Sequence, residues 1–144
     1  MADQSSGPIV VGVDGSETAL RAAEVAAGLA EELGTSLHVV SAYEHEGRHE
    51  VVGVGSDKWY VGDADEATTA AQNAASRFAA GVEVTDSAPK GKPADVLIAE
   101  AERLGARMIV VGNHRMQGAG RILGSVANSV AHHAPCDVYI VRTT

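Results

Sequence analysis

Cysteine, aromatic residues and long apolar runs are scarce in this sequence. Its 144 residues include one cysteine, one Trp, one Phe and three Tyr. The lone Cys136 excludes a disulfide framework and a metal site built from several thiolates, and it fits a reducing compartment. No apolar run reaches the roughly 18 residues of a membrane span. Residues 1–7 also lack the basic and apolar regions of a signal peptide. We therefore expect a soluble, cytoplasmic protein with no membrane contact.

Basic residues are also few. Nineteen acidic side chains against eleven Lys and Arg give a net charge of −8, which argues against DNA or RNA as a partner. Residues 1–100 carry 17 acidic and 6 basic side chains, whereas residues 101–144 carry two acidic residues and five arginines. A positive segment in an acidic protein suits a small anionic ligand. Solvated arginines on helix faces would give the same charge pattern.

Hydrophobic residues make up 45% of the chain. Segments with the apolar spacing of a β-strand alternate along it with segments that have the apolar spacing of an α-helix. The expected strands are residues 8–13, 37–43, 82–88, 107–112 and 136–142. The expected helices lie between Ser16 and Gly34 and over 65–80, 93–104 and 125–133. This alternation predicts a single α/β domain over 1–144, with an open, doubly wound parallel sheet and helices on both faces. We expect a loose N-terminus over 1–7 and a long loop over 44–64.

In such a sheet, ligands bind beyond the carboxyl ends of the strands, where the strand order reverses. Gly12 and Asp14 follow the first strand, where a small residue admits a ligand and a carboxylate accepts hydrogen bonds. A plain Asp-Gly turn, with Ser16 capping the next helix, would give the same pattern. Ala42, at the end of the second strand, has the small side chain that a flat pocket requires.

The segment 112–125 follows the fourth strand and contains four glycines in fourteen residues. Glycines expose backbone N–H groups, and Gly124-Ser125 opens a helix whose N-terminus carries a positive dipole end. Arg115 and Arg121 add positive charge. Together these features indicate an anion site, with a flexible connecting loop as the alternative interpretation.

Five stretches of the chain resemble the universal stress protein family. They are residues 11–17 (Val-Gly-Val-Asp-Gly-Ser-Glu), 91–95 (Gly-Lys-Pro-Ala-Asp), 108–114 (Met-Ile-Val-Val-Gly-Asn-His), 123–130 (Leu-Gly-Ser-Val-Ala-Asn-Ser-Val) and 134–141 (Ala-Pro-Cys-Asp-Val-Tyr-Ile-Val). The nucleotide-binding branch of that family carries the signature Gly-x2-Gly-x9-Gly-Ser/Thr. Gly112, Gly124 and Ser125 match its first glycine and its final pair. Arg115 stands at the second glycine, and eight residues separate it from Gly124.

The resemblance implies a Rossmann-like sheet of five strands in the order 3-2-1-4-5. It also implies an adenine-nucleotide site at the ends of strands one and four. The residues expected to contact the base and ribose are Gly12, Val13, Asp14, Ala42, Val111, Gly112 and His114. Those expected to surround the phosphates are Gly124, Ser125, Val126 and Ala127.

Arg115 has two opposite interpretations. Its guanidinium could clamp a phosphate, which would favour AMP or cyclic AMP, or it could occupy the space that ATP requires. Mg²⁺ could accompany bound ATP. No carboxylate in 112–125 would hold the metal or orient water, so we expect binding with little or no turnover rather than an enzyme.

Other reactive residues have simpler explanations. Ser16 and Ser125 are expected as helix caps and Cys136 as a small packed hydrophobe. His38, His45 and His49 could form a metal cluster only if the long loop brought them together, so no metal site is expected.

The last strand is expected at the edge of the sheet. Its Val138, Ile140 and Val141 are apolar, and an uncovered apolar edge invites aggregation unless it is paired. The resemblance implies that two such strands meet antiparallel in a homodimer. The predicted function is thus a cytoplasmic, dimeric stress-response protein that binds an adenine nucleotide. The alternative is a dimeric interaction module of the same family that binds no nucleotide.

Overall fold

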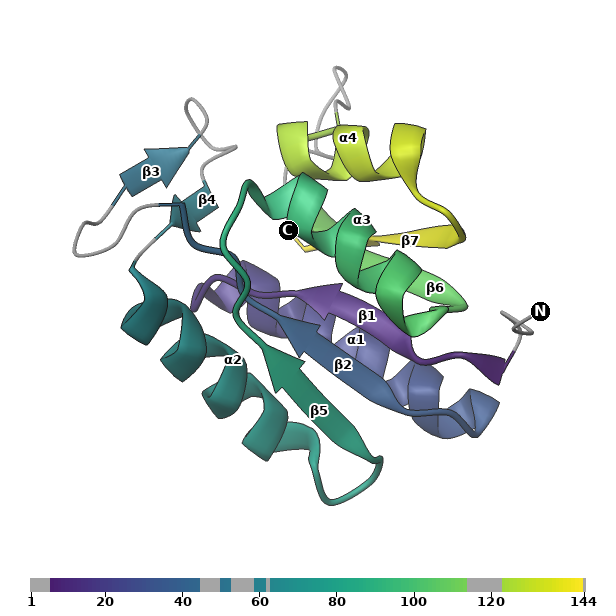
Figure 1. Ribbon diagram of the computed structural model, residues 1–144. Coiled ribbons are helices and arrows are strands. Elements are labelled where there is room, and N and C mark those ends of the chain that lie inside the picture. Colours follow the sequence, from purple (N-terminus) through teal and green to yellow (C-terminus); the bar gives the residue numbers. More distant parts are fainter. Residues whose placement is uncertain (1–5, 45–49, 53–58, 62, 114–122, 144) are drawn as a thin grey trace.

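A computed structural model describes residues 6–44, 50–52, 59–61, 63–113 and 123–143. The main sheet contains β1 (Ile9–Gly12), β2 (Leu37–Val40), β5 (Val84–Ser87), β6 (Met108–Asn113) and β7 (Asp137–Arg142). The helices are α1 (Glu17–Leu33), α2 (Ala64–Phe78), α3 (Pro93–Leu104) and α4 (Ser125–His133). Figure 1 shows the strands side by side in the order β5-β2-β1-β6-β7. Every neighbouring pair in it is parallel. This is the predicted order 3-2-1-4-5, and the fold prediction is confirmed.

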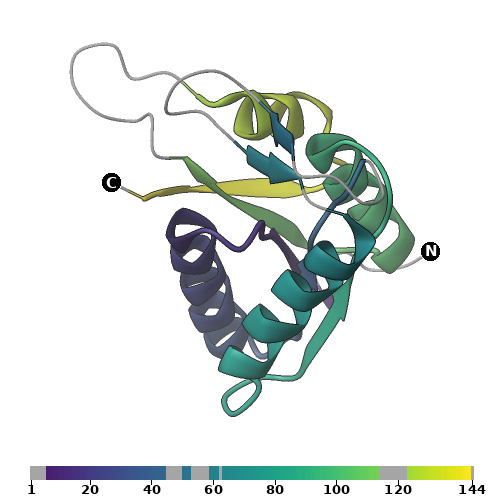
Figure 2. The same ribbon diagram turned by 90° about the vertical axis from the view of Figure 1, so that its left-hand side faces the viewer.

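The sheet is covered on both faces. The helices α1 and α2 pack on one face and α3 and α4 on the other (Figure 2). A hydrophobic core lies on each face of the sheet, and alternate residues of β1 are buried in one or the other. Ile9 and Val11 belong to the core on the α1–α2 side and Val10 to the core on the α3–α4 side. Every fully buried residue of α1 and α2 is alanine. The small alanine side chains let these helices lie close to the sheet, which explains how a chain with few aromatics fills its core.

The helix boundaries follow the predicted signals. Ser16 caps α1 by accepting a hydrogen bond from the Ala19 N–H at 3.2 Å. Gly34 and Gly105 end α1 and α3 with φ of 67° and 61°, a left-handed conformation that favours glycine. Pro93 is the first residue of α3, as expected from its fixed φ. Among the described residues, no helix has the length and apolarity needed to cross a membrane.

One sequence prediction requires correction. The segment 44–64 is not a loop throughout, because β3 (Glu50–Val52) and β4 (Trp59–Val61) pair antiparallel within it. These strands have only three residues each, too few to show a clear apolar period, although valine, tyrosine and tryptophan favour strands. The loose N-terminus predicted over 1–7 stays a prediction, because residues 1–5 lie outside the described residues. Of the described part, the Gly7 carbonyl accepts a hydrogen bond from the Thr35 hydroxyl, in the turn between α1 and β2, at 2.8 Å.

Candidate functional site

The carboxyl ends of β1, β2 and β6 lie next to one another. Gly12 is paired with Val40 of β2, and the Val13 N–H donates to the Val40 carbonyl at 2.8 Å. On the other side, Val11 is paired with Val110 of β6. Since the next residues of each strand emerge at the same edge, the first-strand turn lies between Ala42 and Gly112. The structure thus brings together three segments that the sequence separates by up to 100 residues.

Asp14 forms a tight turn at this edge. Its Oδ1 accepts hydrogen bonds from the Ser16 N–H at 3.0 Å and the Ser16 hydroxyl at 2.6 Å. Ser16 in turn caps α1. This is the Asp-Gly turn that was the alternative interpretation of the segment, and it fixes the direction of the Asp14 carboxylate.

The N-terminus of α4 is tied to the end of β6 by Asn113. The side chain of Asn113 is 3% exposed, and its Oδ1 accepts a hydrogen bond from the Gly124 N–H at 2.8 Å. This bond sets the first turn of α4 beside the end of β6. Sequence reasoning missed Asn113. The signal for it was a polar residue immediately after a run of buried apolar ones.

The first turn of α4 differs from those of the other helices in the charge of its side chains. The first turns of α1, α2 and α3 all contain acidic residues, namely Glu17, Asp65, Glu66 and Asp95. That of α4 contains none, and its N-cap Gly124 supplies no side chain to the helix N–H groups. The positive end of this helix dipole therefore stays uncompensated by its own turn, as an anion site requires.

Several predicted contact residues are deeply buried. Val13, Ala42, Val111 and Ala127 are between 1% and 5% exposed, with their side chains in the two cores. A ligand at this edge would therefore meet mainly their backbone. Ser125 is exposed and Val126 is half-buried at the start of α4.

Gly112 has a packing reason to be glycine. A Cβ atom there would lie 3.1 Å from the Thr143 methyl group, 3.4 Å from Ala22 Cβ and 3.4 Å from the Thr18 carbonyl oxygen. A side chain at this position would thus point toward α1, so the close approach of α1 to β6 depends on a glycine here. Contact between the Gly112 backbone and a nucleotide stays a prediction. His114 and Arg115 lie outside the described residues, and their expected roles stay predictions as well.

His38 and Cys136 were the other candidate residues within the described part of the chain. His38 is buried in β2 and contacts Glu100 of α3, while His45 and His49 lie outside the described residues. No group of three His, Cys, Asp or Glu side chains suited to a metal occurs in the part of the chain that the structure describes. Burial and the nearby Asp137 raise the pKa of the half-buried Cys136 thiol, which makes it a poor nucleophile.

The model of the universal stress protein family matches residues 6–142 of the chain. The chain belongs to the universal stress protein family. This universal stress protein is 34% identical to one from Mycobacterium tuberculosis over 149 aligned positions, which cover 94% of this chain and 96% of its relative. The family membership expected from the sequence is confirmed.

Solved universal stress proteins share the fold. One crystallised in complex with cAMP superimposes with a TM-score of 0.74 at 29% identity, covering 97% of this chain and 99% of its own. Another, from Archaeoglobus fulgidus in complex with dAMP, has a TM-score of 0.72 at 28% identity and covers 94% and 98% of the two chains. Both bound molecules are adenine nucleotides with a single phosphate.

Proposed function

We propose that this universal stress protein binds an adenine nucleotide at the carboxyl ends of β1 and β6. The observation that carries the proposal is the hydrogen bond from the Gly124 N–H to Asn113 Oδ1, which sets the uncompensated N-terminus of α4 beside these strand ends. Such a helix end binds phosphate through its free N–H groups and its dipole. The complexes of two relatives with cAMP and dAMP support the same ligand class.

In this proposal the base lies against Gly12, Val13 and Asp14 of the first turn, with Ala42 as the floor of its pocket. The ribose follows Val111, Gly112 and His114, and the phosphates lie at the first turn of α4, against Gly124, Ser125, Val126 and Ala127. Mg²⁺ would enter with ATP and would be held chiefly by the phosphates and water. The first turn of α4 has no acidic residue, and Asp14 already accepts two hydrogen bonds from Ser16. We therefore propose that the protein binds the nucleotide without efficient turnover. Its proposed role is that of a cytoplasmic stress-response protein.

Identification of the nucleotide is the direct test. Protein purified without added nucleotide should release AMP, cyclic AMP or ATP on denaturation, and calorimetry should give saturable binding of the same compound. A protein that carries no nucleotide and shows no heat with any of the three would contradict the proposal. That result would favour the alternative function, a dimeric interaction module of the same family that binds no nucleotide.

Variants of Arg115 should separate the two roles expected of that residue. If the guanidinium clamps a phosphate, Arg115→Ala should weaken binding by about tenfold, the effect of losing one charge-assisted hydrogen bond. If it obstructs the site, Arg115→Gly should tighten ATP binding in particular. Calorimetry with ATP and cyclic AMP measures both effects. Equal affinities in the wild type and both variants would show that neither role applies.

We also propose a homodimer through the edge strand β7. Thr143 N–H donates to the Asn113 carbonyl of β6, and successive residues of a strand direct their N–H groups to opposite sides. The Ile140 N–H therefore points away from β6, toward the free edge. Val138 and Ile140 are half-buried, Tyr139 is 44% exposed, and Val141 is 5% exposed within its own core. Val138, Ile140 and Tyr139 would thus contact the second copy, and Val141 would support the strand from inside.

Ile140→Pro should convert the dimer to a monomer or an aggregate. Proline removes the outward N–H that pairing with a second β7 would use, while the hydrogen bonds to β6 stay intact. Ile140→Val keeps the N–H and should stay dimeric. Light scattering at micromolar concentration measures the mass, for which a monomer is 14.8 kDa. A monomeric mass for the wild type would overturn the dimer.

A further inference from the structure

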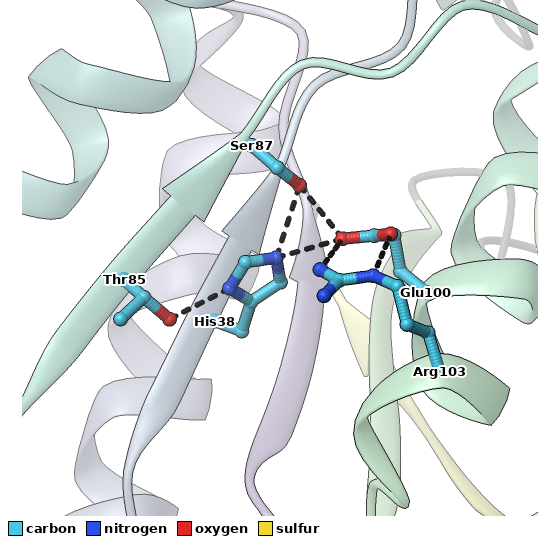
Figure 3. A network of polar contacts seen from close by, with 5 residues as sticks. All are labelled: His38, Thr85, Ser87, Glu100 and Arg103. Atoms are coloured by element: carbon cyan, nitrogen blue, oxygen red, sulfur yellow. Dashed lines mark hydrogen bonds and ion pairs between the residues drawn. The ribbon is translucent and has the colours of Figure 1, made fainter.

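Five polar side chains form a network on the α3 side of the sheet (Figure 3). His38 of β2 lies at its centre and is 4% exposed. Its Nδ1 is 2.7 Å from the Thr85 hydroxyl of β5, and its Nε2 is 3.0 Å from both the Ser87 hydroxyl and Glu100 Oε2. Arg103 holds both oxygens of Glu100 through its Nε and Nη2 at 2.8 and 2.7 Å.

The acceptor at Glu100 determines where the protons of this network lie. The Arg103 guanidinium holds the pKa of the Glu100 carboxyl at about 2, so the group is ionised and only accepts hydrogen bonds. The Ser87 hydroxyl donates to Glu100 Oε2 at 2.9 Å. The His38 Nε2 must therefore carry a hydrogen. In the neutral ring Nδ1 then presents a lone pair, and the Thr85 hydroxyl must donate to it.

His38 is neutral near pH 7. Burial lowers the pKa of its imidazole below the ordinary 6.5, although Glu100 on α3 and Asp86 on β5 act in the opposite direction. Arg103 adds to the lowering. The lone pair on Nδ1 is consequently present at the pH where a base has to accept a proton.

Thr85 is accessible, unlike the base behind it. It is an exposed residue on β5, the strand at the edge of the sheet opposite to β7. Thr68, an exposed threonine on α2, donates its hydroxyl to the Ala64 carbonyl at 2.8 Å, and a carbonyl oxygen is no base. The two threonines thus share exposure and differ in the group that receives the hydroxyl hydrogen.

We propose that Thr85 is a nucleophile that accepts an acyl group from activated carboxylic esters, with His38 as its general base. A hydroxyl within hydrogen-bond reach of an imidazole, which a carboxylate orients from its other side, is the arrangement that activates an alcohol. Glu100 is a positioning residue. It holds the Nε2–H and stabilises the imidazolium that forms when His38 takes the proton.

The step balances with the ester as the only co-reactant. The Thr85 oxygen attacks the ester carbonyl while its hydrogen passes to His38 Nδ1. The bond from the carbonyl carbon to the leaving oxygen then breaks, and the leaving group departs as an alcohol or phenol with the proton from His38. Thr85 is left as an acyl ester and His38 as the neutral base.

The test uses the full chain and p-nitrophenyl acetate as the probe. Peptide mass spectrometry should find one acetyl group on Thr85 and none on Thr68, and p-nitrophenol release should show a burst of no more than one equivalent. Thr85→Val, an isosteric change at an exposed position, should abolish this label, and Thr85→Ser should retain it. His38→Gln should slow the labelling about 100-fold or more. The labelling rate of the wild type should fall on acidification from about pH 8 to about pH 5, as His38 becomes protonated.

Three outcomes would overturn the proposal: no acetyl group on Thr85, equal labelling of Thr85 and Thr68, or unchanged labelling in His38→Gln with its fold intact by circular dichroism. If His38→Gln does not fold, the comparison of Thr85 with Thr68 and the pH profile of the wild type still decide. Nucleotide binding plays no part in this readout, so it stands apart from the proposed nucleotide site.

Discussion

Replacing Gly124 with valine should abolish nucleotide binding and leave the fold intact. Gly124 has φ −65° and ψ 166°, an extended conformation that valine adopts readily, so the substitution introduces no backbone strain. Its N–H can still donate to Asn113 Oδ1. The branched side chain would instead stand at the start of α4, where the helix N–H groups have to approach a phosphate. Calorimetry should show affinity lowered by about 100-fold or more, and circular dichroism should be unchanged.

Two further variants serve as controls for this result. Ser125→Ala removes one hydroxyl and should cost about 1 kcal/mol, or about fivefold in affinity. Gly124→Ala adds one methyl group and should fall between the wild type and Gly124→Val. If Gly124→Val binds nucleotide as well as the wild type, the phosphates do not lie at the N-terminus of α4.

Glu100→Ala should lower the free energy of unfolding by about 3 kcal/mol. Glu100 is 8% exposed and is the shared acceptor for His38, Ser87 and Arg103. Without it, the buried Nε2–H of His38 and the Ser87 hydroxyl both lose a charged acceptor, and a hydrogen bond to a charged group contributes about 1.5 to 3 kcal/mol. Urea denaturation followed by circular dichroism measures the change.

Glu102→Ala is the matched control, because Glu102 is an exposed glutamate on the same helix. It should change the free energy of unfolding by no more than about 0.5 kcal/mol. Equal stability of the Glu100 and Glu102 variants would show that the network contributes nothing to the docking of α3.

Stability should also fall in acid, with the sign set by two lowered pKa values. The pKa of Glu100 is about 2 in the folded chain against an ordinary 4.5, so its contribution is present above pH 4.5 and is lost as pH falls toward 2. The pKa of His38 lies below 6.5, so the unfolded chain binds the proton first and stability declines as pH falls below 6.5. Urea denaturation across this range should show both declines, and Glu100→Ala should remove the one below pH 4.5.

Local signals in the sequence predicted the helix boundaries well. Ser16, Gly34, Pro93 and Gly105 act through their own backbone or through a neighbour within a few residues. The β3–β4 pair was missed, because three-residue strands obtain their stability from a partner and carry too short a pattern to detect.

The candidate site was predicted only in outline. Gly124 and the strand ends were found from glycine content and from the general rule for open sheets. Asn113 was missed, because the role of its side-chain oxygen is recognised only once the N–H group that donates to it is known. Gly112 was assigned to ligand contact, which stays a prediction, whereas the structure shows that the close approach of α1 to β6 requires a glycine there.

By itself the sequence determined the alternation of strands and helices, the fold class, the caps and the family, because these depend on periodicity and on motifs contiguous in the chain. Only the tertiary structure decided which side chains meet. His38 and Glu100 are 62 positions apart, and their contact exists because α3 lies across β2. The same holds for Asn113 and Gly124, which the return of the chain after β6 brings together. Contacts of this kind depend on how layers pack, and no local pattern of residues specifies that.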